Sequence, residues 1–373
     1  MKILYDQQIF SFQDYGGISR YFYELTSRIK KTKNNILVDG RFSNNIYLPK
    51  LKSNVVKILP QFTFPHKNLL IFYLNRLFGI GHLSRKDFDI FHATYFHPYF
   101  LNNLNGRPYI ITVYDMVPEL FAGDFKGMSK QTLEYKRKTI CNADQVIAIS
   151  ENTKKDLINL YGISEEKIHV IYLGNPLEKA IPSKVRNLPK RYLLYVGNRS
   201  GYKNFTLFIE AVTPILKKDN TLFLVCAGGG MFSDEEKRLL SKLEIGNQVK
   251  QVGFKDDNEL AYIYKKALVY VLPSLYEGFG MTALEAFSMG CPVVASNTSS
   301  IPEVCGKAVI YINPESTKSI SNGVEKLLKD PKLRVNLVKL GYQQVKKFSW
   351  DKTVKKTLNV YEKVLNSYNK ALL

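Results

Sequence analysis

Two glutamates, Glu277 and Glu285, stand eight residues apart in the segment PSLYEGFGMTALEA, which runs from an apolar strand through a glycine-containing loop into a helix. Both carboxylates can face one crevice at the carboxyl end of the strand. The free backbone N–H groups of Gly280, Met281 and Thr282, with the helix dipole, form a cradle for an anion or another polar ligand. The segment therefore predicts a site that binds hydroxyl groups beside an anion. Alternatively, Glu277 only caps the loop and Glu285 lies on the helix surface.

Two cations follow another strand, in the segment YVGNRSGYKNF. Arg199 and Lys203 stand four residues apart, after Gly197 and at the start of a helix expected over 204–216. A guanidinium pairs with a phosphate through two parallel hydrogen bonds, and an ammonium adds a mobile point charge. The segment predicts a diphosphate-binding site, with an exposed basic turn as the alternative.

Near the N-terminus, Gly16 and Gly17 lead into an amphipathic stretch over 19–30. Paired glycines allow the backbone to approach a ligand closely, and Ser19 can cap the helix. By itself this pair predicts a simple turn as readily as a site.

Three further polar residues lie at or near the ends of expected strands. Tyr114 can hydrogen-bond a hydroxyl through its phenol, which does not titrate near neutral pH. Asp115 either orients a neighbour or is structural, and His92 either lines a pocket or packs in the core. Metal ligation would need further ligands at suitable spacing, and the sequence shows none, so we expect no metal.

Apolar, β-rich runs alternate with amphipathic stretches along most of the chain, which is typical of a parallel sheet covered by helices. The expected strands cover 2–5, 35–38, 55–58, 90–93, 109–114, 145–149, 192–196, 222–227, 249–252, 269–272, 292–295 and 309–312. The expected helices cover 19–30, 151–160, 206–216, 234–243, 256–266, 281–289, 316–329, 331–348 and 351–365. The fold class is therefore α/β.

The 373 residues suffice for two domains of about 150 residues each. We expect two Rossmann-like, doubly wound domains, over 1–176 and 190–349, that face each other across a cleft. The stretch 177–189, rich in proline and basic residues, is expected to link them. Ligands of such sheets bind outside the carboxyl ends of the strands, where the glutamates and cations lie.

The formal net charge of +20 suits a nucleic acid, an anionic membrane surface or an anionic small substrate. Lys and Arg are spread along the chain without a nucleic-acid-binding motif, so we expect no nucleic-acid partner. The four cysteines form no CxxC pair, and no stretch is long and apolar enough to span a bilayer. We expect a cytoplasmic protein, compatible with peripheral association on the inner face of the cytoplasmic membrane.

The segment around Glu277 and Glu285 resembles the motif of glycosyltransferase family 4, in which seven residues separate two glutamates, and the resemblance extends over nearly the whole chain. Members of this family adopt the GT-B fold and use nucleotide-sugar donors. The resemblance implies that Glu277 contacts the transferred sugar and that Glu285 holds the ribose hydroxyls. It also implies that the amides of Gly280, Met281 and Thr282 contact sugar and phosphate.

The same resemblance implies that Arg199 and Lys203 bind the donor diphosphate and stabilise the leaving group, next to Gly197. The loop with Gly16 and Gly17 corresponds to the glycine-rich loop that closes on donor phosphate and acceptor. Catalysis is thus expected from Glu277, Arg199 and Lys203, and donor binding from the glycines and Glu285.

One position departs from the family pattern. Many members have His-Asp where this chain has Tyr114 and Asp115, so the role of that histidine is open here. With His92, these residues are expected to line the acceptor or sugar pocket. The resemblance further implies that 350–373 returns to the acceptor-binding domain 1–176, while 190–349 binds the nucleotide sugar.

We therefore expect a retaining hexosyltransferase that needs no metal or other cofactor. Mannose from GDP-mannose is the favoured donor, and a growing bacterial surface polysaccharide, such as O-antigen, or a lipid-linked oligosaccharide is the acceptor. The alternatives are a nucleotide-sugar processing enzyme of the same fold, such as an epimerase, and a noncatalytic protein that binds sugar or nucleotide.

Overall fold

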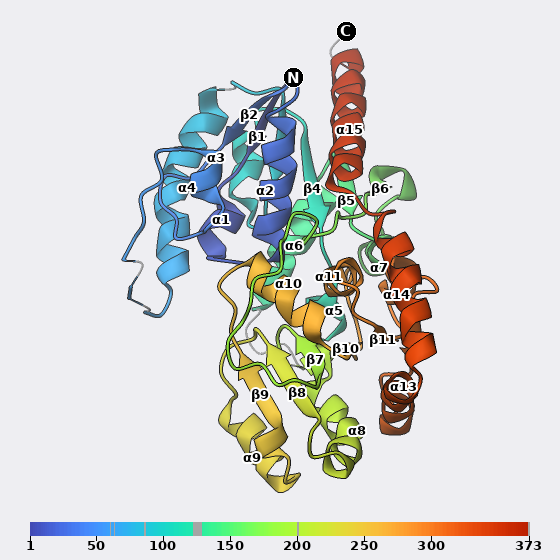
Figure 1. Cartoon of the computed structure of the whole chain (residues 1–373). Helices are drawn as coiled ribbons and strands as arrows, with labels where there is room; N and C mark the ends of the chain where they lie inside the picture. Colours follow the sequence, from blue (N-terminus) through green and yellow to red (C-terminus); the bar gives the residue numbers. More distant parts are fainter. Residues whose placement is uncertain (60, 63, 86, 122–128, 200, 372–373) are drawn as a thin grey trace. The chain divides into compact units, whose positions relative to one another are not determined.

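The computed structural model describes residues 1–59, 61–62, 64–85, 87–121, 129–199 and 201–371 (Figure 1). The chain divides into two compact units. The first comprises Met1–Leu120, Lys126–Gly174 and Trp350–Leu373, and the second comprises Phe121–Phe125 and Asn175–Ser349. Within the described ranges, each unit contains one parallel sheet of six strands.

The first sheet has the strand order β2-β1-β3-β4-β5-β6. Its strands are β1 (Lys2–Tyr5), β2 (Asn35–Val38), β3 (Ile90–Ala93), β4 (Tyr109–Val113), β5 (Gln145–Ala148) and β6 (Ile168–Val170). Leu4 of β1 stands opposite Leu37 of β2 and Phe91 of β3. The direction of winding changes beside β1, so the switch point of this sheet lies between β1 and β3.

The helices of the first unit follow the strands in the usual β-α alternation. They are α1 (Gln8–Phe12), α2 (Gly17–Ile29), α3 (Leu48–Leu51), α4 (Lys67–Arg85), α5 (Val117–Leu120), α6 (Lys130–Cys141), α7 (Glu151–Tyr161) and α15 (Trp350–Ala371), with 3-10 turns η1 (Pro98–Asn103) and η2 (Glu165–Lys167). Helix α7 shows how local chemistry sets the ends: the Ser150 side chain accepts from Thr153 N at its start, and Gly162 ends it with φ 67°.

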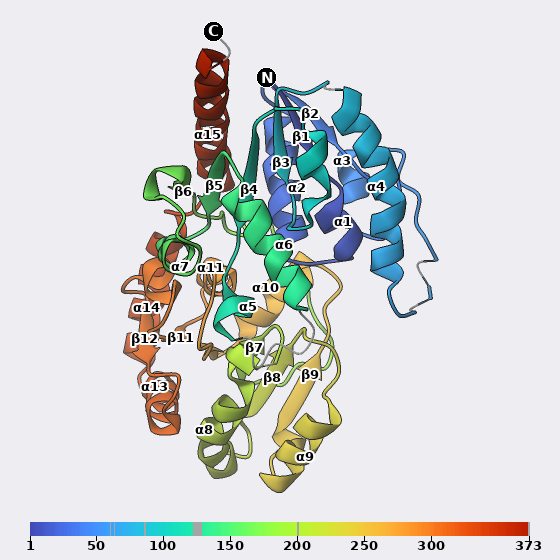
Figure 2. The same ribbon diagram turned by 180° about the vertical axis from the view of Figure 1, so that it is seen from behind.

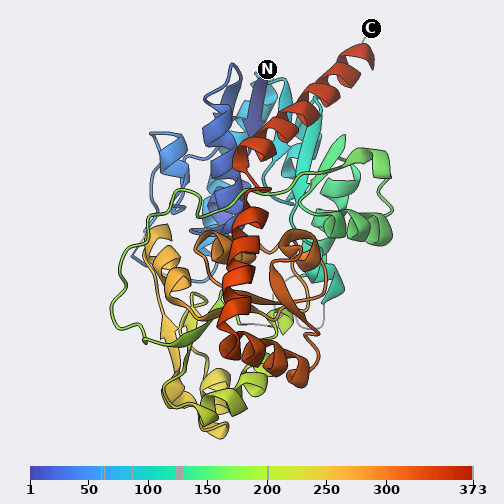
Figure 3. The same ribbon diagram turned by 45° about the vertical axis from the view of Figure 1, so that its right-hand side comes forward.

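Helix α15 packs on α2 of the first unit, and Figure 3 shows the two helices against each other, in red and blue. Trp350 is buried at its start, where a Cβ on Gly174 would lie 2.4 Å from the Trp350 nitrogen. Further along, the hydroxyls of Tyr361 and Tyr5 are 2.8 Å apart in the core. The C-terminal segment is therefore part of the core of the first unit, where the resemblance placed it.

The second sheet has the strand order β12-β11-β10-β7-β8-β9, and Figure 2 shows β7, β8 and β9 side by side. Its strands are β7 (Tyr192–Val196), β8 (Phe223–Ala227), β9 (Val249–Val252), β10 (Val269–Leu272), β11 (Val293–Ser296) and β12 (Val309–Ile312). Here the winding reverses beside β7, so the switch point lies between β7 and β10. Loops that follow these two strands should carry the ligand site of this unit.

The second unit's helices cover this sheet. They are α8 (Phe205–Lys218), α9 (Asp234–Lys242), α10 (Asp257–Lys266), α11 (Met281–Ser288), α12 (Ile301–Cys305), α13 (Thr317–Lys329) and α14 (Pro331–Val345), with 3-10 turns η3 (Gly201–Lys203) and η4 (Gly246–Gln248). Phe208 of α8 and Val324 of α13 are fully buried in one apolar cluster with Leu224 and Val271 of the strands. This packing holds the strands that present the candidate site.

One expected strand is absent, and one strand of the structure was not expected. Residues 55–58 form no strand of the sheet; Val56 makes only an isolated bridge with Phe42, and its side chain is half exposed. Conversely, β6 was not expected, because its three residues, one of them His169, give too short an apolar pattern at the sheet edge. The other expected strands form within one residue of their expected ends.

The expected linker, 177–189, belongs to the second unit in the structure. Ile181 N donates to Asn258 Oδ1 at 2.9 Å, and Ser183 N donates to Asn258 O at 3.0 Å. The segment is therefore attached to the start of α10. The assignment of acceptor and donor binding to the two domains stays a prediction.

Candidate functional site

The loops after β7, β10 and β11 meet at the carboxyl edge of the second sheet. Leu275 N donates to Tyr202 O at 2.8 Å, and Asn204 Nδ2 donates to Pro273 O at 3.0 Å. These bonds join the loop after β7 to the loop after β10. The two motifs of the sequence that carry charge are therefore held at the switch point of the sheet.

At this edge Lys203 and Glu277 form an ion pair. Lys203 Nζ lies 2.8 Å from Glu277 Oε1 and 2.9 Å from Oε2, and Ser274 Oγ donates to Oε1 at 2.7 Å. The Lys203 side chain is 22% exposed and that of Glu277 is 12% exposed. The ammonium is therefore within reach of solvent, and an anionic ligand could compete for it.

The backbone of Glu277 is held from the loop after β11. Glu277 N donates to Ser299 Oγ at 2.9 Å, and Ser300 Oγ donates to Glu277 O at 2.7 Å. Neither serine was expected in the site, and the only signal in the sequence was a polar run directly after a buried strand. The two hydroxyls fix the loop, so the carboxylate of Glu277 has a set position.

Helix α11 begins at this edge. Its N-cap residue, Gly280, has φ 95°, a left-handed conformation that favours glycine, and no side chain caps the helix. The first N–H groups of the helix, at Met281 and Thr282, are those that lack partners within a helix. The expected cradle of amides thus lies on the loop that carries Glu277.

Glu285 lies in the second turn of α11 and is buried, so the alternative of a surface glutamate was wrong. Tyr264 of α10 donates its hydroxyl to Glu285 Oε2 at 2.9 Å. Burial, and then the charge of Glu285, raise the pKa of Tyr264 well above its ordinary value. The phenol therefore stays protonated and orients this carboxylate.

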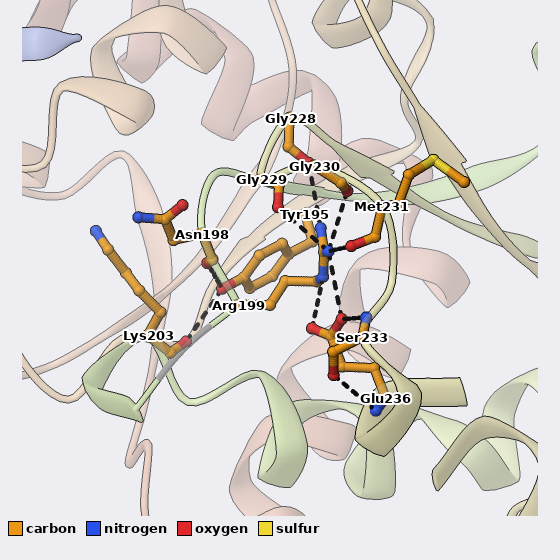
Figure 4. Close-up of polar contacts among 10 residues, drawn as sticks. All are labelled: Tyr195, Asn198, Arg199, Lys203, Gly228, Gly229, Gly230, Met231, Ser233 and Glu236. Carbon is orange, nitrogen blue, oxygen red and sulfur yellow. Dashed lines mark hydrogen bonds and ion pairs between the residues drawn. The ribbon is translucent and has the colours of Figure 1, made fainter. Parts of the chain in front are cut away.

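Arg199 does not lie with Lys203 in the structure, and the expectation that both hold one diphosphate stays a prediction. Figure 4 shows their side chains extending to opposite sides of the loop. The guanidinium, 3% exposed, pairs with Glu236 at 2.7 Å between Nε and Oε1. It also donates to four successive carbonyl groups, those of Gly228, Gly229, Gly230 and Met231.

The physical reason is desolvation. A buried guanidinium needs acceptors for its N–H groups, and the turn after β8 supplies them. Gly229 has φ 69°, and a Cβ there would lie 2.4 Å from Gly197 O and 2.8 Å from Arg199 Nη1. Glu236 also closes the capping box of α9 with Ser233. The spacing of Ser233 and Glu236 was readable in the sequence, but its link to Arg199 was not.

In the first unit, Gly16 is the N-cap residue of α2, and Gly17 is its first residue. A Cβ on Gly16 would lie 2.5 Å from Gln13 Oε1. That oxygen accepts from Ser19 N at 3.2 Å, while Ser19 Oγ donates to Gly16 O at 3.0 Å. Gln13 therefore caps this helix, not Ser19 as expected.

Tyr114 is buried, with its ring edge-on to Tyr21 at 5.7 Å between centroids. Its hydroxyl has no hydrogen-bond partner among the described residues. A buried hydroxyl left unbonded costs about 1–3 kcal/mol, so the position is suited to a polar group from a ligand.

Asp115 has a structural role. Its Oδ1 accepts from Val117 N at 3.1 Å, and its carbonyl accepts from Lys136 Nζ at 2.9 Å.

His92 does not line a pocket, which corrects the expectation for it. The ring is fully buried, with Nδ1 2.6 Å from Tyr361 Oη and Nε2 2.9 Å from Thr112 Oγ1. Burial lowers the pKa of His92 to about 3, so the ring is neutral. The hydroxyl of Tyr361 on α15 occupies Nδ1, and the hydroxyl of Thr112 on the neighbouring strand β4 occupies Nε2.

Asp6, directly after β1 at the first sheet's switch point, was missed. Its Oδ1 accepts from Thr94 N at 2.9 Å, and its Oδ2 accepts from Gln8 Nε2 at 2.6 Å. Burial raises the pKa of Asp6 to about 6. A lone acidic residue after an apolar strand was the available signal. Asp6 holds the loops after β1 and β3 together.

Two kinds of feature are absent from the described residues, a metal-binding cluster and a membrane-spanning helix. No group of three or more His, Cys, Asp or Glu side chains in the described ranges could hold a metal ion. Over the same ranges, no helix is both long and apolar enough to cross a membrane.

Comparison with known proteins identifies the family. Residues 178–344 match the model of glycosyl transferases group 1, and residues 15–179 match that of Glycosyltransferase Family 4. The uncharacterized glycosyltransferase MJ1607 of Methanocaldococcus jannaschii is 30% identical over 302 residues, which cover 76% of this chain and 77% of that protein. The chain belongs to glycosyltransferase family 4.

A second relative, O-antigen chain mannosyltransferase B of Escherichia coli, is 28% identical over 60% of this chain and 62% of that protein. Among solved structures, sucrose-phosphate synthase of Thermosynechococcus elongatus aligns with a TM-score of 0.77 at 20% identity, covering 98% of this chain and all of that one. HepE of Anabaena, in complex with UDP and glucose, aligns with a TM-score of 0.75 at 17% identity, covering 97% and 100%. The fold is that of the GT-B glycosyltransferases.

Proposed function

We propose that this glycosyltransferase moves a hexose from a nucleotide sugar to a growing bacterial surface polysaccharide or a lipid-linked oligosaccharide at the inner face of the membrane. Mannose from GDP-mannose is the favoured donor, since two relatives are O-antigen chain mannosyltransferases. The observation that carries the proposal is the Lys203–Glu277 pair at the switch point of the second sheet, beside the amides at the start of α11.

In this proposal the donor exchanges partners with the ion pair. Lys203 Nζ leaves Glu277 for the donor diphosphate, and the amides of Met281 and Thr282 take further phosphate or sugar oxygens. The freed carboxylate of Glu277 accepts a hydroxyl of the transferred sugar. Negative charge grows on the diphosphate as the glycosidic bond breaks, so a cation held there lowers the barrier.

The reaction is proposed to retain the anomeric configuration and to need no metal. The bond between sugar C1 and the phosphate oxygen breaks, and a bond from C1 to the acceptor oxygen forms on the same face. The acceptor's proton passes to the departing phosphate oxygen. Cation charge comes from Lys203, and the helix N-terminus adds partial positive charge.

Glu285 and Arg199 are proposed to have separate roles. Glu285, oriented by Tyr264, is proposed to hold the ribose hydroxyls. Arg199 is proposed as a positioning residue for the turn 228–231, because its donors are taken up by that turn and by Glu236.

The test is a donor screen that follows nucleoside diphosphate release with and without a lipid-linked oligosaccharide. We expect release from GDP-mannose that depends on the acceptor, persists in EDTA and gives a product whose anomeric configuration matches the donor by NMR. Conversion of the donor sugar without acceptor would favour the epimerase-like alternative. Donor binding without any turnover would favour a noncatalytic protein, and an inverted product would exclude retention.

A further inference from the structure

The first unit exposes an apolar surface on the outer side of one helix, a side that is usually polar because it faces water. It consists of the outer side of α4, with Leu69, Leu70, Tyr73, Leu77 and Phe78, and we call it the α4 face. All five side chains are exposed, and Leu77 is 71% exposed. Figures 1 and 2 show α4 at the outside of the first unit in both views.

The other side of α4 already forms the core contact of this helix. It packs on α1 and η1, and Ile71, Phe72 and Leu83 are fully buried there. Leu69, Tyr73 and Leu77 follow one another at intervals of four residues, so they form a row on a different side of the helix. A helix that is apolar on its outer side as well as its inner side needs a second apolar environment.

The segment before α4 extends this surface. Lys67 is buried, and its Nζ donates to Leu59 O at 2.7 Å and to Phe62 O at 2.9 Å. These bonds attach the preceding turn to the first residue of α4. The side chains of Leu59, Phe62 and Phe64 are exposed there, so the apolar surface continues past the helix start.

The stretch of sequence that carries this surface is basic. Between Asp39 and Asp87 the sequence contains no Asp or Glu, but it contains eight Lys and Arg residues. Among these, Arg41, Lys57 and Arg85 are exposed. Arg41 lies against this surface, with its Cζ 5.4 Å from the ring centroid of Phe78. An apolar surface with cations beside it is complementary to a bilayer with anionic headgroups, in which apolar side chains enter the acyl boundary and cations stay at the phosphates.

We propose that the α4 face is the surface by which this protein lies on an anionic lipid bilayer. A second copy of the chain fits less well, because it would bring the same cations together without acidic partners. The inference deepens the membrane part of the proposed function and rests on it for the location of the acceptor. It concerns lipid binding, however, which is measured without donor or transfer.

The test measures binding of the full chain to vesicles by co-sedimentation. We expect binding to phosphatidylcholine vesicles with about 30% phosphatidylglycerol, and weaker binding at high salt or without the anionic lipid, since salt screens the charges. The double variant Leu70→Gln/Leu77→Gln should bind these vesicles about tenfold more weakly. Because both side chains are exposed, its thermal unfolding should match that of the wild type.

The matched control is Ile181→Gln/Val335→Gln, which changes two exposed apolar residues of the second unit and should leave vesicle binding unchanged. Wild-type binding by the α4 double variant would overturn the proposal. The proposal would also be overturned if the wild type does not bind vesicles but forms a concentration-dependent dimer, and the double variant does not form that dimer. Intact vesicle binding with no glycosyl transfer would refute the proposed function and leave the α4 face standing.

Discussion

Arg199 and Lys203 are four residues apart in the chain, but their surroundings differ in kind. The Arg199 guanidinium is almost fully buried and is bound by Glu236 and by the carbonyls of one glycine-rich turn. The Lys203 ammonium is partly exposed and pairs with Glu277, the first glutamate of the family motif. In the structure the first cation is bonded by buried acceptors of the protein, whereas the second is within reach of solvent and is the one we propose to exchange its partner for a ligand.

The difference shows that residue type and spacing do not by themselves set the surroundings of a side chain. What separates the two cations is whether the fold satisfies their hydrogen bonds internally. Removing a satisfied buried charge should reduce stability, and removing an exchangeable one should reduce the rate. Measurements of stability and of kcat on single variants test this difference between Arg199 and Lys203.

The largest effect is expected for Lys203→Gln. It removes the cation that meets charge on the leaving diphosphate, so kcat at saturating donor should fall about 10³-fold. The urea midpoint of unfolding should shift little, because the pair is partly exposed. The control is Lys217→Gln, whose exposed lysine pairs with Glu244 away from the site. A kcat within a few-fold of wild type would remove Lys203 from catalysis.

Arg199→Gln should act mainly on stability. It removes the buried guanidinium that binds the carbonyl groups of 228–231 and the partly exposed carboxylate of Glu236, which should lower the free energy of unfolding by about 1–3 kcal/mol. The kcat of the protein that remains folded, measured at low temperature, should fall much less than for Lys203→Gln. If instead kcat falls as far and urea unfolding is unchanged, Arg199 acts on the diphosphate and the contrast is wrong.

Glu285→Gln should weaken donor binding about tenfold while kcat changes little, since ribose contacts are equal in ground and transition states. Glutamine still accepts from Tyr264, so the helix should keep its packing. Calorimetry of donor binding and saturation kinetics provide the measurement. Tyr264→Phe, which keeps the carboxylate, should have the smaller effect. A fall in kcat alone would move Glu285 from binding to catalysis.

His92 of the first unit resembles Arg199, because the hydrogen bonds of its buried ring are also made within the protein. Its pKa is about 3 when folded but near 6.5 when unfolded, so below pH 6.5 only the unfolded chain gains the proton. Stability therefore falls as pH falls, by about 1.4 kcal/mol from pH 5.5 to 4.5. Urea unfolding of wild type and His92→Gln at both pH values isolates this contribution. If the free energies of unfolding of wild type and His92→Gln differ by the same amount at both pH values, the ring of His92 is not buried in its neutral form.

Much of the fold was predictable. Strands such as β7 and β10 carry their own apolar runs, and α7 carries its own cap and stop at Ser150 and Gly162. The motif from Glu277 to Glu285 was also local, since one loop and one helix hold both residues. Strand β6 was missed because three residues at an edge give little pattern.

The sequence by itself determined the β-α alternation, the two-unit plan and the position of charged residues after particular strands. Those properties depend on neighbours along the chain. Only the tertiary structure decided the partners: Arg199 with Glu236, 37 residues away, Lys203 with Glu277, 74 away, and His92 with Tyr361, 269 away. Such pairs depend on strand order and on the return of α15, because a hydrogen bond is set by distance in space and not by separation in sequence.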